Sequence, residues 1–290
     1  MLTSLLDSLW NVICSQARRF LLPYLLRRSK RNYPSISHNI NRLTDNTVIK
    51  SSTIDKLRLE ADALRFIAQH TSIPVPHVYD VWITDPKTNT GYLAMEYIPG
   101  EMVGRVWRKL SPEQRASFMR KLGQYLDEMR SLRQPLPGGW IGSLTAGPSY
   151  DRFAAPSSMY GPFANETSYN DWRISRTKRA ASESEKAALR LAELRREMPD
   201  DHRISFTHGD ISNRNILVRV TGEGPDDIDI VAILDWEQAG WRPEYWEMFK
   251  IRFVMSGHEF STLARQLIFP GYETELELES EMIQISGLPI

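Results

Sequence analysis

The sequence predicts an α+β protein of two lobes, in which a small β-rich lobe with one helix precedes a larger, mainly helical lobe. Short apolar segments typical of strands dominate residues 34–98, and Pro99-Gly100 follows them as a hinge. Beyond the hinge, apolar residues recur at steps of three and four, which indicates helices. With 290 residues, 41% of them hydrophobic and 25% charged, the chain has the composition of an ordinary soluble protein and enough length for two cores.

The N-terminal segment is a separate feature. Residues 2–22 carry apolar positions on one side and polar positions on the other, and they predict an amphipathic helix that ends near Pro23. We interpret residues 1–33 as this helix and a basic linker with Arg27, Arg28, Lys30 and Arg31. Charged residues interrupt the apolar runs, so the segment is too short to span a bilayer, and it lacks the pattern of a signal peptide. We favour a helix packed on its own domain; contact of residues 2–22 with an anionic membrane surface is the alternative.

The small lobe, residues 34–98, has a predicted order of strand, strand, helix, strand and strand. Two strand pieces flank the turn Thr44-Asp45-Asn46, and prolines break the pattern after the helix. The predicted elements are strand pieces within Ile40–Lys50, a helix at Asp55–His70, and strands at Val78–Thr84 and Tyr92–Ile98.

The larger lobe, residues 99–290, combines helices with three short strands. Ser111-Pro112-Glu113-Gln114 predicts a capping box that opens a helix, whereas residues 134–170 hold most of the Pro, Gly and Ser and predict an irregular loop. We expect the acidic tail Glu273–Glu281 to be a solvated face. The other predicted elements are a charged helix at Glu183–Met198, strands at Ile204–Thr207, Asn215–Val220 and Ile228–Leu234, and helices over the remainder.

Charge balance and cysteine count restrict the class of function. Lys plus Arg and Asp plus Glu both number 36, so the formal net charge is zero and no nucleic-acid partner is predicted. The single cysteine, Cys14, excludes an intramolecular disulfide and a cysteine-built metal site, which fits a cytoplasmic protein.

The strongest chemical signal is the polar loop that runs from His208 to Asn215 between two apolar strands. Asp210 and Asn215 lie five residues apart in it, and Asp235 follows the next strand. Phosphoryl transfer needs a carboxylate near the attacking hydroxyl and oxygen ligands for Mg²⁺, and this order of residues matches the catalytic and metal loops of kinases. Each residue taken alone is more often a turn former, so the prediction rests on the combination.

A lysine and a glutamate upstream provide an independent signal. Lys50 ends the apolar run Thr47-Val48-Ile49, and kinases place such a lysine against the nucleotide phosphates. On the following helix, Glu60 shares the buried face with Leu57 and Leu64. A buried carboxylate is costly unless it is paired, so we expect Glu60 to pair with Lys50.

Four motifs carry a resemblance to a known family. They resemble the aminoglycoside phosphotransferase and choline kinase superfamily, and a fungal-type branch in particular, over roughly Ile40–Phe260. The motifs are Thr207–Val218, Leu234-Asp235-Trp236-Glu237, Pro137–Ser143 and the run Ala239–Trp246.

The resemblance implies a protein-kinase-like fold, ATP and Mg²⁺ as cofactors, and a small-molecule hydroxyl as the phosphate acceptor. It implies Asp210 as catalytic base, with His208 bracing the loop, and Asn215 and Asp235 as metal ligands. The residues implied to contact the nucleotide are Lys50, Glu60, Met95 and Tyr97.

The sequence also departs from the family pattern. Residues 40–46, where a glycine-rich phosphate loop is expected, contain no glycine, which leaves a catalytically weak pseudokinase or scaffold as an alternative. Gly209 and the Asp235-Trp236-Glu237 motif argue against a protein kinase. Glu237 is either a further metal-site carboxylate or a bystander, and the acceptor molecule and the oligomeric state are not determined by the sequence.

Overall fold

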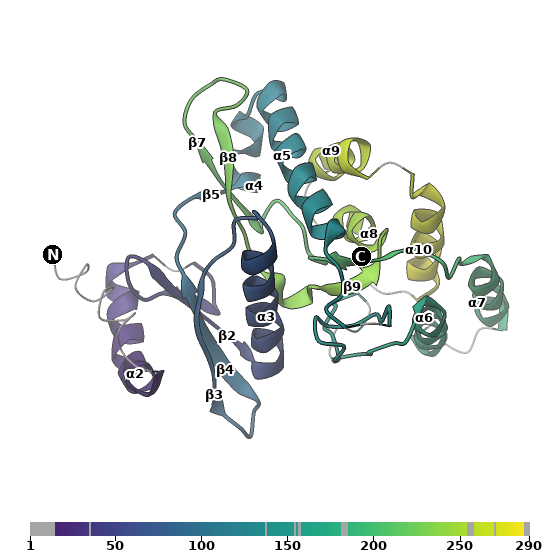
Figure 1. Cartoon of the computed structure of the whole chain (residues 1–290), viewed down its shortest axis with the longest axis horizontal. Helices are drawn as coiled ribbons and strands as arrows, with labels where there is room; N and C mark the ends of the chain where they lie inside the picture. Colours follow the sequence, from purple (N-terminus) through teal and green to yellow (C-terminus); the bar gives the residue numbers. More distant parts are fainter. Residues whose placement is uncertain are drawn as a thin grey trace. The chain divides into compact units, whose positions relative to one another are not determined.

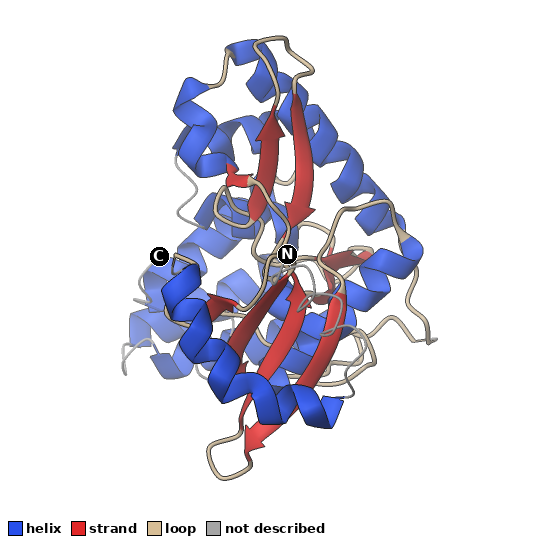
Figure 2. Ribbon diagram, turned by 90° about the vertical axis from the view of Figure 1, so that its left-hand side faces the viewer, coloured by secondary structure: helices blue, strands red, loops and turns tan. Residues whose placement is uncertain are grey.

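The computed structural model describes residues 15–34, 36–136, 138–153, 155, 158–180, 185–253, 258–269 and 271–286 (Figures 1 and 2). The chain forms two compact units: Met1–Gly100 with Val231–Glu237, and Glu101–Ile230 with Gln238–Ile290. We expected the second unit to contain all residues after the hinge at Pro99-Gly100, but Val231–Glu237 belongs to the first unit. The predicted α+β class is confirmed. Across the described ranges, every helix is too short or too polar to cross a membrane.

The first unit is built on an antiparallel sheet with the strand order β1-β2-β4-β3. Helix α3 lies on one face of this sheet and helix α2 on the other (Figure 1). Because both faces are covered, the first four residues of β2 are all buried. The elements are α2 (Ser15–Asn32), β1 (Ile40–Arg42), β2 (Thr47–Thr53), α3 (Ile54–His70), β3 (Val78–Asp85) and β4 (Thr90–Glu96).

Helix α2 differs from the prediction. It continues through Pro23 to Asn32, so the basic cluster lies on a helix and not in a linker; residues 2–14 of the predicted helix lie outside the described residues. Pro23 lacks a backbone donor, which costs about 3 kcal/mol inside a helix. Leu22 and Leu25 are buried against the sheet, and burial of each contributes roughly 1.5–3 kcal/mol, which offsets that loss.

The second unit contains the remaining helices and two small sheets. One sheet has the order β5-β7-β8, and β6 pairs with β9 in the other. Its elements are β5 (Glu101–Met102), α4 (Val103–Val106), η1 (Trp107–Lys109), α5 (Pro112–Ser131), α6 (Glu166–Ala180), α7 (Glu185–Glu197), β6 (Ile204–Thr207), β7 (Ile216–Val220), β8 (Ile228–Ile233, which ends in the first unit), η2 (Trp236–Gln238, which begins in the first unit), β9 (Gly240–Pro243), α8 (Trp246–Phe253), α9 (His258–Ile268) and α10 (Glu273–Ser286).

The capping box at the start of α5 is confirmed. The Ser111 hydroxyl accepts from the Gln114 amide at 3.2 Å, and the Gln114 side chain accepts from the Ser111 amide at 3.1 Å. Two donors that the first helical turn leaves without intrahelical partners are thereby satisfied, which fixes where the helix begins.

Three predictions in this unit were wrong. The loop predicted at 134–170 ends where α6 begins at Glu166, and the four residues of β9 form a strand where helices were expected. The tail is not a solvated face, because α10 buries Leu276, Leu278 and Met282. Even Glu279 is buried there, since it pairs with Arg173 of α6 and accepts from the Tyr245 hydroxyl at 3.2 Å. These partners are distant in sequence, so local pattern did not reveal them.

Candidate active site

Lys50 is the centre of a carboxylate cluster in the first unit. Alternation along β2 directs Ile49 toward α2 and Lys50 toward α3, where Glu60 occupies the buried face of the helix. The Lys50 ammonium lies 2.8 Å from Glu60 Oε2, 2.5 Å from Asp235 Oδ1 and 3.2 Å from Glu237 Oε2. The contact between Lys50 and Glu60 that helix periodicity predicted is therefore present, and Asp235 joins it.

Burial and charge act in opposite directions on this cluster. Burial by itself lowers the pKa of Lys50, but the three carboxylates outweigh it and hold that pKa well above its usual value. Burial raises the pKa of Glu60 to about 7, although the charge on Lys50 opposes the shift. Lys50 is therefore positively charged near neutral pH, and the three carboxylates balance its charge.

Asp235 follows the end of β8 in a backbone conformation that few residues adopt. Its φ is +67°, in the left-handed region, which Asp and Asn enter more readily than other non-glycine residues. The Trp236 indole donates to the Ile233 carbonyl at 2.9 Å and closes the turn around Asp235. Strain of this kind is typical of functional positions, where surrounding contacts maintain it.

Three carboxylates of the first unit could also hold a cation. Ligand oxygens of Glu60, Asp235 and Glu237 all lie within 4.8 Å of one another. Hard carboxylate oxygens are the donors that Mg²⁺ prefers, so the set fits a magnesium ion in its chemistry. The Lys50 ammonium lies within 3.2 Å of the same three carboxylates and already balances part of their charge.

The polar loop His208–Asn215 of the second unit, which we propose below as the catalytic loop, is organised by hydrogen bonds among its own residues. His208 is fully buried, and its Nδ1 accepts from the Asp210 amide at 3.1 Å. The Asn215 side-chain nitrogen donates to the Asp210 carbonyl at 2.9 Å and to Asp210 Oδ2 at 3.2 Å. The structure therefore brings His208, Asp210 and Asn215 together in this unit, as it brings Lys50, Glu60 and Asp235 together in the first.

Gly209 is required by the conformation of this loop. Its φ is +74°, and an added Cβ would lie 2.8 Å from the Gln238 carbonyl oxygen. No L-residue with a side chain fits there without strain. Protein kinases carry an arginine at this place, and an arginine side chain would not fit here without strain.

Glu247, which the sequence analysis missed, holds the catalytic loop from helix α8. Its Oε2 accepts from the His208 amide at 2.6 Å, and both of its carboxylate oxygens accept from the Gly209 amide at 3.2 Å. Glu247 is fully buried, and burial raises its pKa, with His208 and the two amides opposing that shift. The signal that found Glu60 was present here too, since Glu247 lies between Trp246 and Met248 on an apolar helix.

Helix α8 also carries a buried ion pair. Lys250 and Asp151 are both fully buried, with Nζ 2.8 Å from Oδ1. The Trp246 indole donates to Asp151 Oδ2 at 3.0 Å, and Lys250 donates to the Gln238 side chain at 3.0 Å. The network ties the irregular segment before α6 to α8, the helix that supports the catalytic loop. The aromatic side chains of Trp236, Trp241, Tyr245 and Trp246 are all buried, so they pack in the interior.

The glycine-free turn between β1 and β2 uses most of its own backbone donors. The amides of Leu43 and Thr44 donate to the Thr47 carbonyl, and the Asn46 amide donates to the Thr44 hydroxyl. The Arg42 guanidinium holds the carbonyls of Thr44 and Asp45 at 3.0 and 2.9 Å. Few amides of this turn are left to cradle a phosphate.

Met95 and Tyr97 lie at the end of the sheet. Met95 is buried in β4 and pairs with Val48 of β2. The Arg42 guanidinium carbon lies 3.8 Å from the centre of the Tyr97 ring. Their predicted nucleotide contacts remain a proposal.

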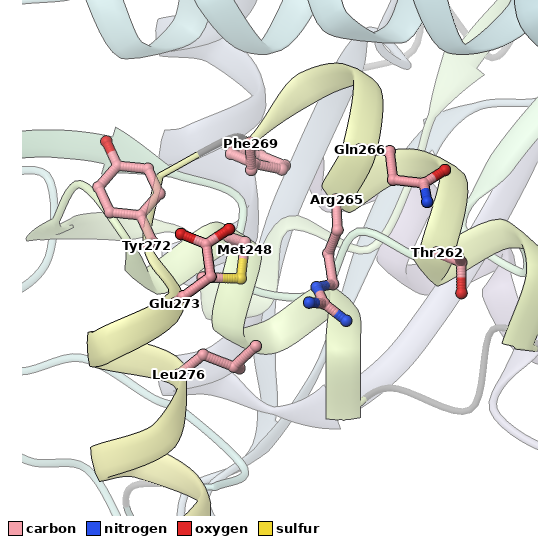
Figure 3. A pocket seen from close by; sticks show the side chains of 8 residues that line it. All are labelled: Met248, Thr262, Arg265, Gln266, Phe269, Tyr272, Glu273 and Leu276. Atoms are coloured by element: carbon pink, nitrogen blue, oxygen red, sulfur yellow. The ribbon is translucent and has the colours of Figure 1, made fainter.

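A pocket of about 180 Å³ lies among α8, α9 and α10 of the second unit (Figure 3). The side chains that line it include the charged Arg265 and Glu273 and the apolar Met248 and Leu276 (Figure 3). None of the predicted site residues lines this pocket, so it is distinct from the groups described above.

The first unit has a four-stranded sheet with a buried lysine–glutamate pair, and the second unit has a loop with Asp210 and Asn215. This combination is typical of the kinase-like phosphotransferases. The chain belongs to the phosphotransferase enzyme family, which it matches over residues 16–278. This match extends beyond the expected Ile40–Phe260 and includes most of α2 and the first half of α10. The predicted superfamily, kinase-like fold and phosphotransferase class are confirmed.

Solved structures of aminoglycoside phosphotransferases share the fold. A GDP complex of wild-type aminoglycoside 2'-phosphotransferase-IIIa has a TM-score of 0.62 at 10% identity, with 93% of this chain and 90% of that chain covered. The streptomycin–ATP–APH(2")-IIa ternary complex has a TM-score of 0.58 at 13% identity, with coverages of 94% and 90%. A thermostable APH(4)-Ia mutant with AMP-PNP and hygromycin B has a TM-score of 0.58 at 13% identity, with coverages of 87% and 82%. No curated protein matches the chain by sequence.

Proposed function

We propose that the protein transfers the γ-phosphate of ATP to a hydroxyl group of a small molecule, with Mg²⁺ as cofactor. The observation that carries this proposal is the buried Lys50, held by Glu60 from the next helix and by Asp235 from the end of β8. The three carboxylates around Lys50 keep its buried ammonium charged. A charged ammonium at this place can bind the phosphate oxygens of ATP. The proteins of similar fold were solved with GDP, with ATP and streptomycin, or with AMP-PNP and hygromycin B, which supports a nucleotide and a small-molecule acceptor for this chain.

Asp210 is proposed as the catalytic base. Its carboxylate accepts the proton of the acceptor hydroxyl as the hydroxyl oxygen bonds to the γ-phosphorus; the bond from that phosphorus to the bridging oxygen breaks, and ADP leaves with the electron pair. Asn215 donates to Oδ2 of Asp210 and so fixes the carboxylate. His208 and Glu247 hold the loop backbone, and they act as positioning residues.

Asn215 and Asp235 are proposed as metal ligands. Because the Asn215 side-chain nitrogen donates to Asp210, its amide oxygen is the atom that would bind a metal. Mg²⁺, when bound, neutralises charge on the nucleotide phosphates.

A scaffold without catalysis is the second candidate, and the β1–β2 turn is the observation that favours it. Since amides of Leu43, Thr44 and Asn46 already donate within the turn, the phosphates lose a cradle that glycine-rich loops provide. An active enzyme would then depend on Lys50 and the metal for phosphate binding, and its affinity for ATP would depend strongly on Mg²⁺.

A thermal-shift series with two variants separates these candidates. With ATP·Mg²⁺ at about ten times its Kd, the melting temperature should rise by roughly 3 °C, whereas ATP with a chelator should raise it far less. Asp210→Asn should keep this shift and lose at least about a hundredfold in turnover, measured as phosphate transfer or background ATP hydrolysis. Asp235→Asn should lose both, and because Asn tolerates a positive φ, the loss reports on charge and not on backbone strain.

Asp127→Asn on the exposed side of α5 is the matched control and should change neither quantity. If ATP·Mg²⁺ gives no shift with the parent protein, nucleotide binding is wrong. If nucleotide binds but Asp210→Asn leaves turnover unchanged, the assignment of Asp210 as catalytic base is wrong. If nucleotide binds and the parent protein has no turnover, the scaffold is the better description.

A further inference from the structure

One face of helix α2 is buried against the sheet, and the other face is exposed to solvent. Leu22, Leu25 and Ser29, spaced three and four residues apart, are buried against the first unit, and the Ser29 hydroxyl donates to the Arg42 carbonyl at 2.5 Å. Figure 2 is viewed from the side that carries α2, and the helix crosses in front of the strands there. Its second face is therefore directed away from the sheet.

An outer stripe of four residues runs along that second face: Phe20, Tyr24, Arg27 and Arg31. Their spacing of four, three and four residues places them on one side of a helix, opposite Leu22, Leu25 and Ser29. Phe20 is 86% exposed and Tyr24 is 59% exposed. Phe20 is the most exposed large apolar side chain in the described part of the chain. Apolar rings that are grouped on an exposed surface often mark an interaction site.

Positive charge without compensation lies next to these rings. Arg27 and Arg31 belong to the outer stripe, and Arg28 and Lys30 flank it. Helix α2 contains no Asp or Glu, and none of these four cations forms an ion pair among the residues that the structure describes. Since the whole chain has a formal net charge of zero, this is a local basic surface and not a reflection of overall charge.

We propose that the outer stripe of α2 docks the protein on an anionic lipid membrane. Aromatic side chains at the lipid interface bury an apolar ring beside the headgroups, and neighbouring arginines meet anionic lipid phosphates. The strength with which a helix binds at the lipid interface depends on its buried apolar area and on its attraction to anionic lipid, and the stripe supplies both contributions. Packing on the domain and contact with a membrane, which the sequence presented as alternatives, are compatible because they use opposite faces of α2. This proposal is independent of the phosphotransferase activity.

Flotation of the full-length protein with vesicles tests the proposal. At about 0.1 M salt the protein should float with phosphatidylcholine vesicles that contain 30% phosphatidylserine and remain behind with pure phosphatidylcholine. The double variant Arg27→Gln/Arg31→Gln should weaken binding to the anionic vesicles by about tenfold or more, since each surface charge contributes roughly fivefold. Phe20→Ser should weaken it by roughly fivefold or more, because the inserted ring is lost.

Two exposed cations of α7, changed in the double variant Lys186→Gln/Arg196→Gln, provide the same change of charge elsewhere and should leave binding intact. All substitutions are at exposed positions, and an unchanged melting temperature verifies the fold. Absence of binding to anionic vesicles overturns the proposal, as does an equal loss in the α7 variant. Binding to single-stranded RNA instead of vesicles, or a concentration-dependent dimer that conceals Phe20, would overturn it as well.

Discussion

Glu60 and Glu247 are carboxylates that each lie among apolar side chains on a buried helix face. Burial of a charge is costly, and each glutamate has a different compensation. Glu60 pairs with the Lys50 ammonium, whereas Glu247 accepts from two backbone amides of the catalytic loop. A lysine can be recognised as a partner in a sequence, but a backbone amide cannot. Glu60 was therefore predicted and Glu247 was not.

Glu247→Gln tests whether this residue positions the loop. The amide group would bring its own donors against the amides of His208 and Gly209, so a buried donor loses its acceptor at a cost of about 1–3 kcal/mol. We expect a lower melting temperature, a loss of turnover at saturating ATP, and an unchanged affinity for ATP·Mg²⁺. Glu193→Gln, at an exposed position of α7, is the control. An unchanged turnover in Glu247→Gln would restrict Glu247 to a structural role.

At the scale of elements, α2 shows how tertiary burial overrides a local break. Pro23 predicts the end of a helix, yet the helix continues because Leu22 and Leu25 fill the outer face of the sheet. Removal of residues 1–30 would take both leucines away and expose Ile49 and Trp82, so we expect this truncation to destabilise the first unit. Residues 15–32 therefore belong to the folded unit and are not an appendage of it.

A pair of identical substitutions checks this conclusion. Leu25→Ala removes a buried side chain and should lower the free energy of unfolding by about 2–5 kcal/mol. Leu21→Ala, on the same helix but 36% exposed, should cost well under half of that. The measurement is chemical denaturation of both variants beside the parent protein. Equal and small losses would show that α2 contributes little to the fold.

At the scale of the whole molecule, stability depends on partners brought together from distant parts of the chain. His202 lies between Glu166 at the start of α6, with 2.8 Å from Nδ1 to Oε1, and Glu275 of α10, with 3.2 Å from Nε2 to Oε1. The hydrogen bond to Glu166 is the main cause that raises the pKa of His202 to about 9, and partial burial opposes it. A protonated imidazole can donate to both carboxylates at once, and a neutral one cannot.

The sign of the pH dependence follows from this shift. The pKa of His202 is higher in the folded state, about 9, than the ordinary value of about 6.5, so its stabilisation is complete below about pH 6.5 and is lost as the pH rises through about 9. We expect the free energy of unfolding to fall over this window by an amount on the order of 1 kcal/mol, since solvent screens a half-buried group. His202→Gln should flatten the profile between pH 7.5 and 9.5. A parent protein whose stability is constant or rises in that window would contradict the assignment.

The sequence by itself determined the features whose cause is local. The apolar run of β2, the periodicity of α3 and the capping box of α5 follow from residues within a few positions of one another. The pairing of Lys50 with Glu60 joins a strand to the helix that directly follows it, ten residues along the chain. The spacing of Asp210 and Asn215 belongs here too, because five residues suffice for the Asn215 side chain to reach back to Asp210.

Tertiary structure alone decided the features whose cause is distant. The buried pair of Lys250 with Asp151, the pairing of β9 with β6, and the burial of Glu279 by Arg173 all join residues that lie far apart in the sequence. A lone charge or a short strand is stable in the interior only when it is paired with another group, and here that group is distant in the sequence. Local pattern therefore assigns such residues to solvent or to loops. Pro23 in α2 and Glu279 in α10 were mispredicted for this reason, because the energy that places them comes from packing partners outside their own segments.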